Sequence, residues 1–188
     1  MSSKITEAFT NKLGTYFFNT LAPQKSAIKQ IIYAFKIHRS RQLIKKYCHP
    51  SFEIKDNYAL FISQVEEDTQ TLFQSEETSL SALKKAKSLS EELNLKLIVR
   101  LHPAEKNLES LISLITFCKL NGIKIDNSGS LLSAVLNAKH VITINSTGGL
   151  HSILLGKNVT CLGATFYNTW KPMDVVLYNK FILKNINQ

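Results

Sequence analysis

Short apolar runs alternate with helical stretches along the chain from about residue 58 to residue 162. In the helical stretches apolar residues recur every three or four positions, and the links between the two kinds of segment are short. Strands alternate with helices in this way when the strands are parallel and each connection crosses back over the sheet. The pattern predicts an α/β fold: a Rossmann-like parallel sheet flanked by helices on both faces.

Local signals set the expected element boundaries. Thr78 or Ser79 is a typical N-cap, and Asn121-Gly122 and Gly156 are typical of helix ends that turn into the left-handed region. The expected strands are 58–64, 95–101, 123–125, 140–144 and 158–162, and the expected helices are 78–93, 107–120, 131–137 and 146–155.

The two ends of the chain differ from this middle part. Residues 5–20 and 26–47 predict two helices, and the second has apolar residues mostly on one side with Lys and Arg around them. Such a helix either lies on a membrane surface or packs on the main domain with a solvated basic face. Residues 174–178 predict an edge strand or a linker. The expected division is a basic helical segment (1–55), a Rossmann-like domain (56–170) and a tail (171–188).

Charge is unevenly distributed. The net charge is +9, and no acidic residue occurs from Ala8 to Phe52. This favours an anionic partner such as phospholipid, nucleic acid or an acidic glycan. Nucleic acid is the weakest of these, because the basic residues and aromatics form no recognisable RNA- or DNA-binding module.

The sequence also bears on the compartment. No apolar run reaches the roughly 18–20 residues that span a bilayer, and the first residues are too polar for a signal peptide. The three cysteines are widely spaced, which argues against disulfides or a zinc site. These features predict a cytoplasmic protein. Such a protein could also bind peripherally to the inner face of the inner membrane.

Every expected strand delivers small or polar residues to the same edge of the sheet. Ligands of open parallel sheets bind beyond the carboxyl ends of the strands. The segments that follow the strands are 64–70, 102–103, 126–128, 145–149 and 163–167. Their convergence predicts one ligand site at this edge.

The turn at 145–149 is the most interpretable of these segments. Asn145 is followed by the hydroxyls of Ser146 and Thr147 and by Gly148 and Gly149, at the start of an expected helix. Free N–H groups and the helix dipole favour an anion there, which predicts a phosphate cradle. The alternative is that Ser146 is only an N-cap and the glycines only allow close packing.

Two further side chains are candidates. His102, at the turn before Pro103, could donate to a phosphate or act as an acid, or be structural. Asp68 lies in an acidic run that is either a solvated loop or a contact for sugar hydroxyls, and it is the one weak candidate for catalysis. No spacing of ligand-type residues supports a metal, so neither metal nor cofactor is expected.

Taken together, these segments resemble the capsule polysaccharide biosynthesis and export family, which includes bacterial Kdo transferases. The matching runs are QVEEDTQ at 64–70, LHPAE at 101–105, TINSTGGL at 143–150, LLGK at 154–157 and LGATFY at 162–167. The resemblance implies a GT-B glycosyltransferase, with two Rossmann-like lobes, that transfers a sugar from a CMP-activated donor, CMP-Kdo, to a lipid-linked glycan acceptor.

The resemblance also implies roles for residues. His102, Ser146 and Thr147 would contact the donor phosphate, Gly148 and Gly149 would shape the same turn, and Gln64 and Asp68 would lie nearer the transferred sugar or acceptor. His151 stands where many members have Glu or Gln, and it would lie close to the nucleotide.

Length separates two readings of the function. About 55 residues precede the first expected strand, too few for a second Rossmann lobe. The chain is therefore expected to be the C-terminal, donor-binding half of such an enzyme. The alternative is a catalytically incomplete nucleotide-binding module that needs a partner lobe.

Overall fold

The computed structural model of the 188-residue chain describes residues 27–48, 57–65 and 78–186. The predicted helix at 5–20 and Asp68 lie outside these residues. The chain divides into two compact units, Met1–Phe35 and Lys36–Gln188. The second unit contains the sheet and the candidate site.

The sheet has five parallel strands in the order β3-β2-β1-β4-β5. The strands are β1 (Tyr58–Ile62), β2 (Lys96–Arg100), β3 (Lys124–Ile125), β4 (His140–Thr143) and β5 (Asn158–Cys161). The chain builds one side of the sheet from β1 to β3 and then returns past β1 to add β4 and β5. This confirms the predicted α/β fold.

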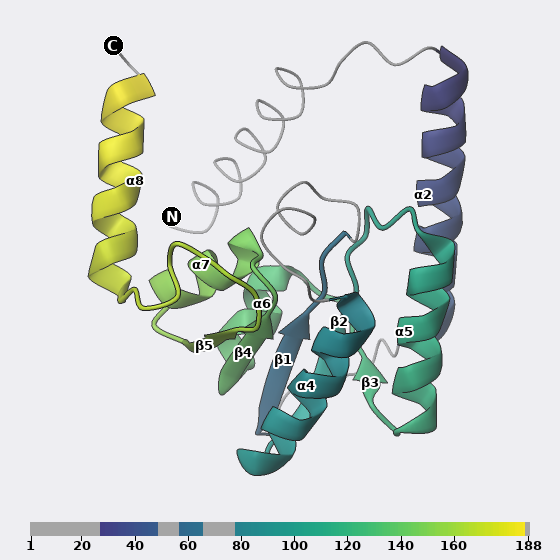
Figure 1. Ribbon diagram of the computed structural model, residues 1–188, viewed down its shortest axis with the longest axis horizontal. Coiled ribbons are helices and arrows are strands. Elements are labelled where there is room, and N and C mark those ends of the chain that lie inside the picture. Colours follow the sequence, from purple (N-terminus) through teal and green to yellow (C-terminus); the bar gives the residue numbers. More distant parts are fainter. Residues whose placement is uncertain (1–26, 49–56, 66–77, 187–188) are drawn as a thin grey trace. The chain divides into compact units, whose positions relative to one another are not determined.

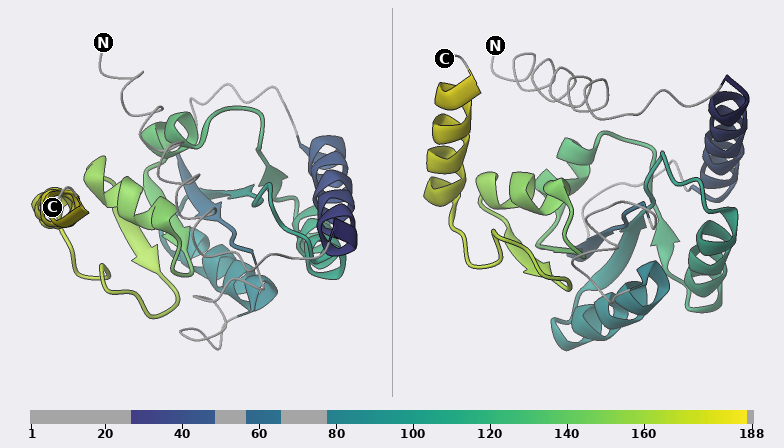
Figure 2. Two further views of the ribbon diagram at one scale, coloured as in Figure 1. Left: turned by 90° about the horizontal axis from the view of Figure 1, so that it is seen from above. Right: turned by 45° about the horizontal axis from the view of Figure 1, so that its top comes forward.

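Helices α4 (Ser79–Glu92) and α5 (Leu108–Leu120) cover one face of this sheet, and α6 (Leu131–Asn137) and α7 (Thr147–Leu154) cover the other (Figure 1 and Figure 2). Helix α8 (Pro172–Ile186) packs against α7. Helix α2 (Ala27–Tyr47) crosses the boundary between the two units. No helix within the described ranges is long and apolar enough to cross a membrane.

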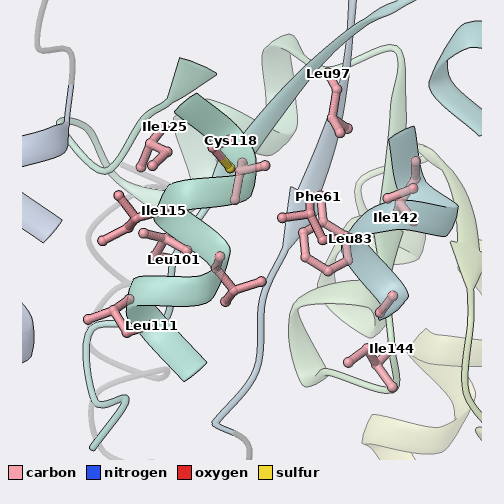
Figure 3. Close-up of a cluster of buried hydrophobic side chains, with 14 of the residues drawn as sticks. Phe61, Leu83, Leu97, Leu101, Leu111, Ile115, Cys118, Ile125, Ile142 and Ile144 are labelled. Carbon is pink, nitrogen blue, oxygen red and sulfur yellow. The ribbon is translucent and has the colours of Figure 1, made fainter. Parts of the chain in front are cut away.

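Alternation along the central strand β1 explains the two layers. Phe61 is fully buried on the face covered by α4 and α5, where it joins Leu83 and Leu111 in one cluster (Figure 3). Tyr58 and Leu60 are buried on the opposite face against α6. A strand buried on both faces is typical of parallel sheets, and burial of each large side chain stabilises the fold by about 1.5–3 kcal/mol.

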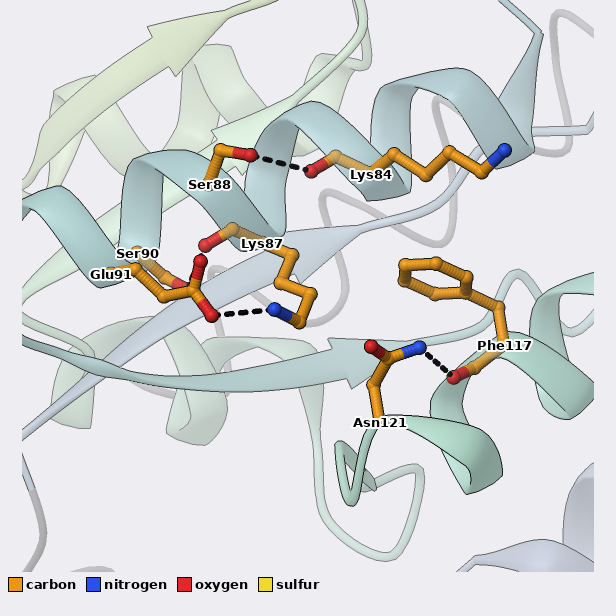
Figure 4. A network of polar contacts seen from close by, with 7 residues as sticks. All are labelled: Lys84, Lys87, Ser88, Ser90, Glu91, Phe117 and Asn121. Atoms are coloured by element: carbon orange, nitrogen blue, oxygen red, sulfur yellow. Dashed lines mark hydrogen bonds and ion pairs between the residues drawn. The ribbon is translucent and has the colours of Figure 1, made fainter.

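Capping residues begin and end the helices at the positions that the sequence predicts. Thr78 caps α4, and its hydroxyl accepts the N–H of Ser81 at 3.2 Å. At the end of α5 the Asn121 amide donates to the Phe117 carbonyl at 2.9 Å (Figure 4), and Gly122 follows with φ of 63°. The nearby surface pair between Lys87 and Glu91 is exposed, so it contributes at most about 0.5 kcal/mol.

The prediction for residues 174–178 was wrong, because they lie in α8. Pro172 occupies the first position of the helix, and the Asp174 carboxylate accepts the N–H of Lys171 at 2.7 Å. Val175 is fully buried against Leu150 of α7. The β-branched pair suggested a strand, but the helix-start signals of Pro172 and Asp174 prevail.

Candidate functional site

The candidate site lies at the carboxyl edge of the sheet, between β1 and β4. The strand order reverses at this point, since β1 pairs with β2 on one side and β4 on the other. Loops that leave neighbouring strands on opposite faces leave room there, and ligands of open α/β sheets bind at such a switch point.

Two consecutive residues after β1 hold the turns on either side. The Ser63 hydroxyl accepts the N–H of His102, at the end of β2, at 2.9 Å. The Gln64 side-chain oxygen accepts the N–H of Asn145, at the end of β4, at 2.8 Å. The Gln64 amide also donates to the Asn145 side-chain oxygen at 2.5 Å. Ser63 and Gln64 therefore hold both turns by hydrogen bonds.

The turn after β4 is built from buried polar contacts. Ser146 caps α7, and its hydroxyl oxygen accepts the N–H of Gly148 at 3.0 Å. The Ser146 carbonyl accepts the N–H of Gly149 at 2.8 Å and also the hydroxyl of Tyr167, which is 2% exposed. The N–H groups of Gly148 and Gly149 and the hydroxyl of Tyr167 therefore already donate to oxygen atoms of Ser146.

Thr147 supplies the donors that remain at this helix start. Its N–H occupies the first helical position, where no intrahelical acceptor exists, and its side chain is exposed. A trans peptide places the Ser146 carbonyl and the Thr147 N–H on opposite sides. Because the carbonyl points to the buried Tyr167 hydroxyl, the N–H points the other way, toward the space an anion would occupy.

The glycines of this turn have packing reasons of their own. A Cβ on Gly149 would lie 2.9 Å from Thr143 Cγ2 and 3.0 Å from the Tyr167 hydroxyl oxygen. A Cβ on Gly148 would lie 3.3 Å from Ile62 Cδ1. Close approach of the helix to the sheet therefore accounts for both glycines, and their contact with a ligand stays a prediction.

The turn after β2 is held by lighter contacts. His102 Nδ1 accepts the N–H of Ala104 at 3.2 Å, so in the neutral ring the proton is on Nε2. The guanidinium of Arg41, on α2, donates to the Pro103 carbonyl at 3.3 Å. Glu105 is buried, and its carboxylate accepts the N–H of Asn107 at 2.7 Å. The arrangement makes Nε2 of His102 a hydrogen-bond donor.

Burial sets the protonation of the groups around α7. It raises the pKa of the Tyr167 hydroxyl, with the neighbouring Cys161 thiol contributing in the same sense, so Tyr167 stays a donor. Burial also raises the pKa of Cys161. Desolvation lowers the pKa of His151 from its ordinary 6.5, although the residue is exposed. The protein therefore favours the neutral form of this ring.

The structure brings most of the expected residues to one edge. Gln64, His102, Asn145, Ser146 and the residues of the α7 start follow β1, β2 and β4 there, whereas Asp68 lies outside the described residues. Within the described ranges no three ligand-type side chains gather as a metal site would require.

Two supporting residues were missed from the sequence. Ser63 could have been found because it directly follows a fully buried strand. Tyr167 carries no local signal, since its role depends on a contact with a residue 21 positions earlier.

The fold is that of a Rossmann-like domain, and the candidate site lies at its switch point. The sequence model described as "Capsule polysaccharide biosynthesis protein" matches residues 4–171, and the chain belongs to this family.

Individual relatives match shorter or more distant stretches. "Protein FixF" from Sinorhizobium fredii is 42% identical over 55 residues, which is 29% of this chain and 13% of that protein. Two solved Kdo transferases of Thermosulfurimonas dismutans also match. The KpsC "beta Kdo 2,7 transferase" has TM-score 0.48 and 24% identity, over 79% of this chain and 50% of that one. The KpsC "beta Kdo 2,4 transferase" has TM-score 0.48 and 16% identity, over 74% and 48%. The chain spans about half the length of these solved structures.

Proposed function

We propose that the chain is the C-terminal, donor-binding lobe of a GT-B glycosyltransferase in capsule or related surface-polysaccharide synthesis. It binds a CMP-activated sugar, CMP-Kdo, and serves its transfer to a lipid-linked glycan acceptor. Membership in the capsule biosynthesis family supports the pathway. The enzyme works as a peripheral protein at the cytoplasmic face of the inner membrane, where such an acceptor is available.

One observation carries the donor site. Ser63 and Gln64, next to each other after β1, hold the turns after β2 and β4 in place. Both turns carry hydrogen-bond donors, and they flank the strand at which the sheet order reverses. A nucleotide phosphate between them would meet groups that are oriented before it arrives, which lowers the cost of binding.

The donors suit a single phosphate group such as that of a CMP-sugar, which carries one negative charge in the donor and gains a second when CMP leaves. The N–H and hydroxyl of Thr147, the hydroxyl hydrogen of Ser146 and Nε2–H of His102 would share the phosphate oxygens, and the α7 dipole favours negative charge at the same place. Such fixed donors stabilise a leaving phosphate as its charge develops, and they need no metal ion.

Gln64 and Asn145 would act differently from the sequence-based proposal. Their side chains are 6% and 4% exposed and are bonded to each other. They would shape the floor of the site, and contact with the sugar would fall to groups above them. Asp68 remains the one candidate for a catalytic or sugar-binding carboxylate.

Isothermal titration with CMP, CMP-Kdo, UDP and UDP-GlcNAc tests the proposal. We expect the CMP ligands to bind selectively. His102→Asn should weaken binding while its side-chain oxygen still accepts the Ala104 N–H. Ser146→Ala should weaken it as well, by about tenfold for each lost bond to a charged group.

A matched control separates ligand contact from helix capping. Ser130 caps α6 as Ser146 caps α7, and its hydroxyl accepts the Ser133 N–H at 3.0 Å. Ser130→Ala should therefore cost similar stability and leave CMP binding unchanged. A folded wild-type chain that binds none of the four ligands would refute the donor site.

The alternative function is a nucleotide-binding module that turns over substrate only with a partner lobe. It is favoured by the single five-stranded sheet within the described residues, since a GT-B enzyme has two such lobes. Binding of CMP-Kdo without sugar transfer to acceptor, by the chain alone, would support this version.

A further inference from the structure

A hollow lies on the surface where the segment after β5 enters α8. Its lining residues come from the end of that segment and from the first two turns of the helix: Thr169, Trp170, Asp174, Leu177 and Tyr178. Its volume is about 530 Å³, within the range of roughly 300–1,000 Å³ that is typical of small-molecule sites. The lining residues belong to one continuous stretch of one compact unit. This aromatic hollow is therefore formed by local structure alone.

Buried contacts hold the lining of the aromatic hollow in place. Val175, which directly follows Asp174, is fully buried in a cluster with Leu150 of α7. Trp170 is half-buried and packs against the same cluster. Because the segment and the helix are both anchored on α7, the solvent-facing residues between them keep a defined arrangement.

Three aromatic rings pack on one another at this place. The ring centre of Phe166 lies 5.2 Å from that of Trp170 and 5.4 Å from that of Tyr178, and the last two lie 5.2 Å apart. At such separations the rings touch, so they do not form a cage around a cationic group. A ligand would lie against the outer surfaces of Trp170 and Tyr178, the two rings that line the hollow.

The polar groups of the hollow are a carboxylate and hydroxyls. Asp174 accepts the N–H of Lys171 with Oδ2, at 2.7 Å. Among the described residues nothing bonds to its second oxygen or to the hydroxyls of Thr169 and Tyr178. The lining includes a carboxylate and no basic residue, so it disfavours a phosphate or another anion. These groups suit a neutral ligand that carries hydroxyls.

We propose that the aromatic hollow binds a neutral pyranose unit of a glycan. A pyranose ring has a face of C–H groups and a rim of hydroxyls. The C–H face lies on Trp170, Tyr178 and Leu177, and the rim hydroxyls bond to Asp174 and Thr169. The hollow thus offers the two features of a small-molecule site, an apolar wall and a few polar groups that set the orientation.

The aromatic hollow is connected to the turn after β4. Phe166 packs edge-to-face on Tyr167, with ring centres 5.3 Å apart. The Tyr167 hydroxyl in turn donates to the Ser146 carbonyl, at the start of α7. With this connection, and resting on the proposed function, the pyranose is a unit of the acceptor glycan. Sugar binding itself does not depend on that function.

Tryptophan fluorescence of the full chain tests the proposal, because Trp170 is the only tryptophan in the sequence. The probes are methyl glycosides of glucose, galactose, mannose and N-acetylglucosamine, and tetrasaccharides of the same sugars. We expect a saturable change in Trp170 emission with at least one sugar, and none with glycerol, which has hydroxyls but no ring face. Tetrasaccharide binding at least as tight as that of the methyl glycosides supports a glycan, whereas binding of the methyl glycosides alone would point to a free sugar. A folded chain that responds to none of these sugars would overturn the proposal.

Matched variants locate the binding. Asp174→Asn should weaken it about tenfold, because Asn still accepts the Lys171 N–H but lacks the charge. Leu177→Ser should weaken it about fivefold through lost apolar contact. Val176 is exposed on the same helix outside the hollow, and Glu109 is in the first turn of α5 as Asp174 is in that of α8.

Val176→Ser and Glu109→Gln should therefore leave sugar binding unchanged. Equal losses in these two controls would overturn the proposal, since the response would then not come from the aromatic hollow. CMP affinity in Asp174→Asn and Leu177→Ser should match that of the wild type. A failure of sugar binding is in this way distinct from a failure of the donor site.

Discussion

The turns after β2 and β4 occupy equivalent places on either side of β1, yet they are built in different ways. The turn after β4 is fixed by buried partners from distant parts of the chain: Gln64 holds Asn145 and Tyr167 holds Ser146. The turn after β2 depends on half-buried contacts, with His102 bonded to the buried Ser63 and to its own neighbour Ala104. The turn after β4 is bonded mainly to distant buried residues, and the turn after β2 is only partly enclosed.

This difference suggests that the two turns have different roles in the proposed site. Buried hydrogen bonds in a medium of low dielectric hold groups in place and are costly to break. The turn after β4 would therefore present donors in a fixed geometry to a phosphate. The turn after β2 is less enclosed and would present the half-buried His102 ring to the ligand. Substitutions in the two turns should then differ both in stability and in binding.

The largest effect is expected at Gly149. Gly149→Ala places a Cβ 2.9 Å from Thr143 Cγ2 and 3.0 Å from the Tyr167 hydroxyl oxygen, so α7 must move from the sheet. We expect a loss of about 3 kcal/mol in the free energy of unfolding, measured by urea denaturation. Gly129→Ala, with open space around its added Cβ, should stay within about 0.5 kcal/mol of wild type. Equal effects would mean that α7 is not packed as tightly as described.

A smaller effect should separate Gln64 from Ser63. Gln64→Leu leaves the buried Asn145 N–H without an acceptor, and we expect a loss of about 2 kcal/mol in the free energy of unfolding. Ser63→Ala removes the acceptor of the half-buried His102 N–H and should cost about 0.5–1 kcal/mol. If Ser63→Ala proved the more damaging change, the contrast between a buried and a half-buried turn would be wrong.

Features that depend on residues close together in the sequence were predicted well. Strands and helices followed from apolar periodicity, and the caps at Thr78, Asn107 and Ser130 depend on residues within a turn of the helix start. The strand order also leads to the site, since it brings the ends of β1, β2 and β4 together. These features are encoded locally or by topology.

Other features depend on contacts that the sequence does not encode locally. The bond between Gln64 and Asn145 depends on the register between two strands that are distant in the sequence, and ligand contact by these residues stays a prediction. Tyr167 reaches Ser146 only because the segment after β5 folds back under α7. Residues 174–178, for which the sequence predicts an edge strand or a linker, lie in α8, where Val175 is buried against Leu150 of α7.

Two buried tyrosines give the next prediction. The Tyr167 hydroxyl donates to the Ser146 carbonyl, and the Tyr58 hydroxyl donates to the Ala134 carbonyl at 2.6 Å. Tyr167→Phe and Tyr58→Phe should each lower the free energy of unfolding by about 1 kcal/mol, because each removes one buried hydrogen bond. Only Tyr167→Phe should also weaken CMP binding, since only that bond orients the peptide that carries the Thr147 N–H. Calorimetry on both variants measures this, and an equal affinity in the two would remove Tyr167 from the site.

The smallest effect should come from His151, on the helix that follows the turn after β4. Its folded-state pKa lies below 6.5 because the surrounding protein desolvates the ring. As the pH falls below 6.5, the unfolded chain takes up a proton at this position before the folded chain does. The free energy of unfolding therefore falls with it. His151→Gln should make the urea midpoint less sensitive to pH between about 7.5 and 5.5 than in wild type. His140, whose pKa is also lowered by burial, would contribute to the sensitivity that remains. An unchanged pH profile in His151→Gln would show that the ring is hydrated in the folded protein, and His151 could then carry a positive charge toward a bound phosphate.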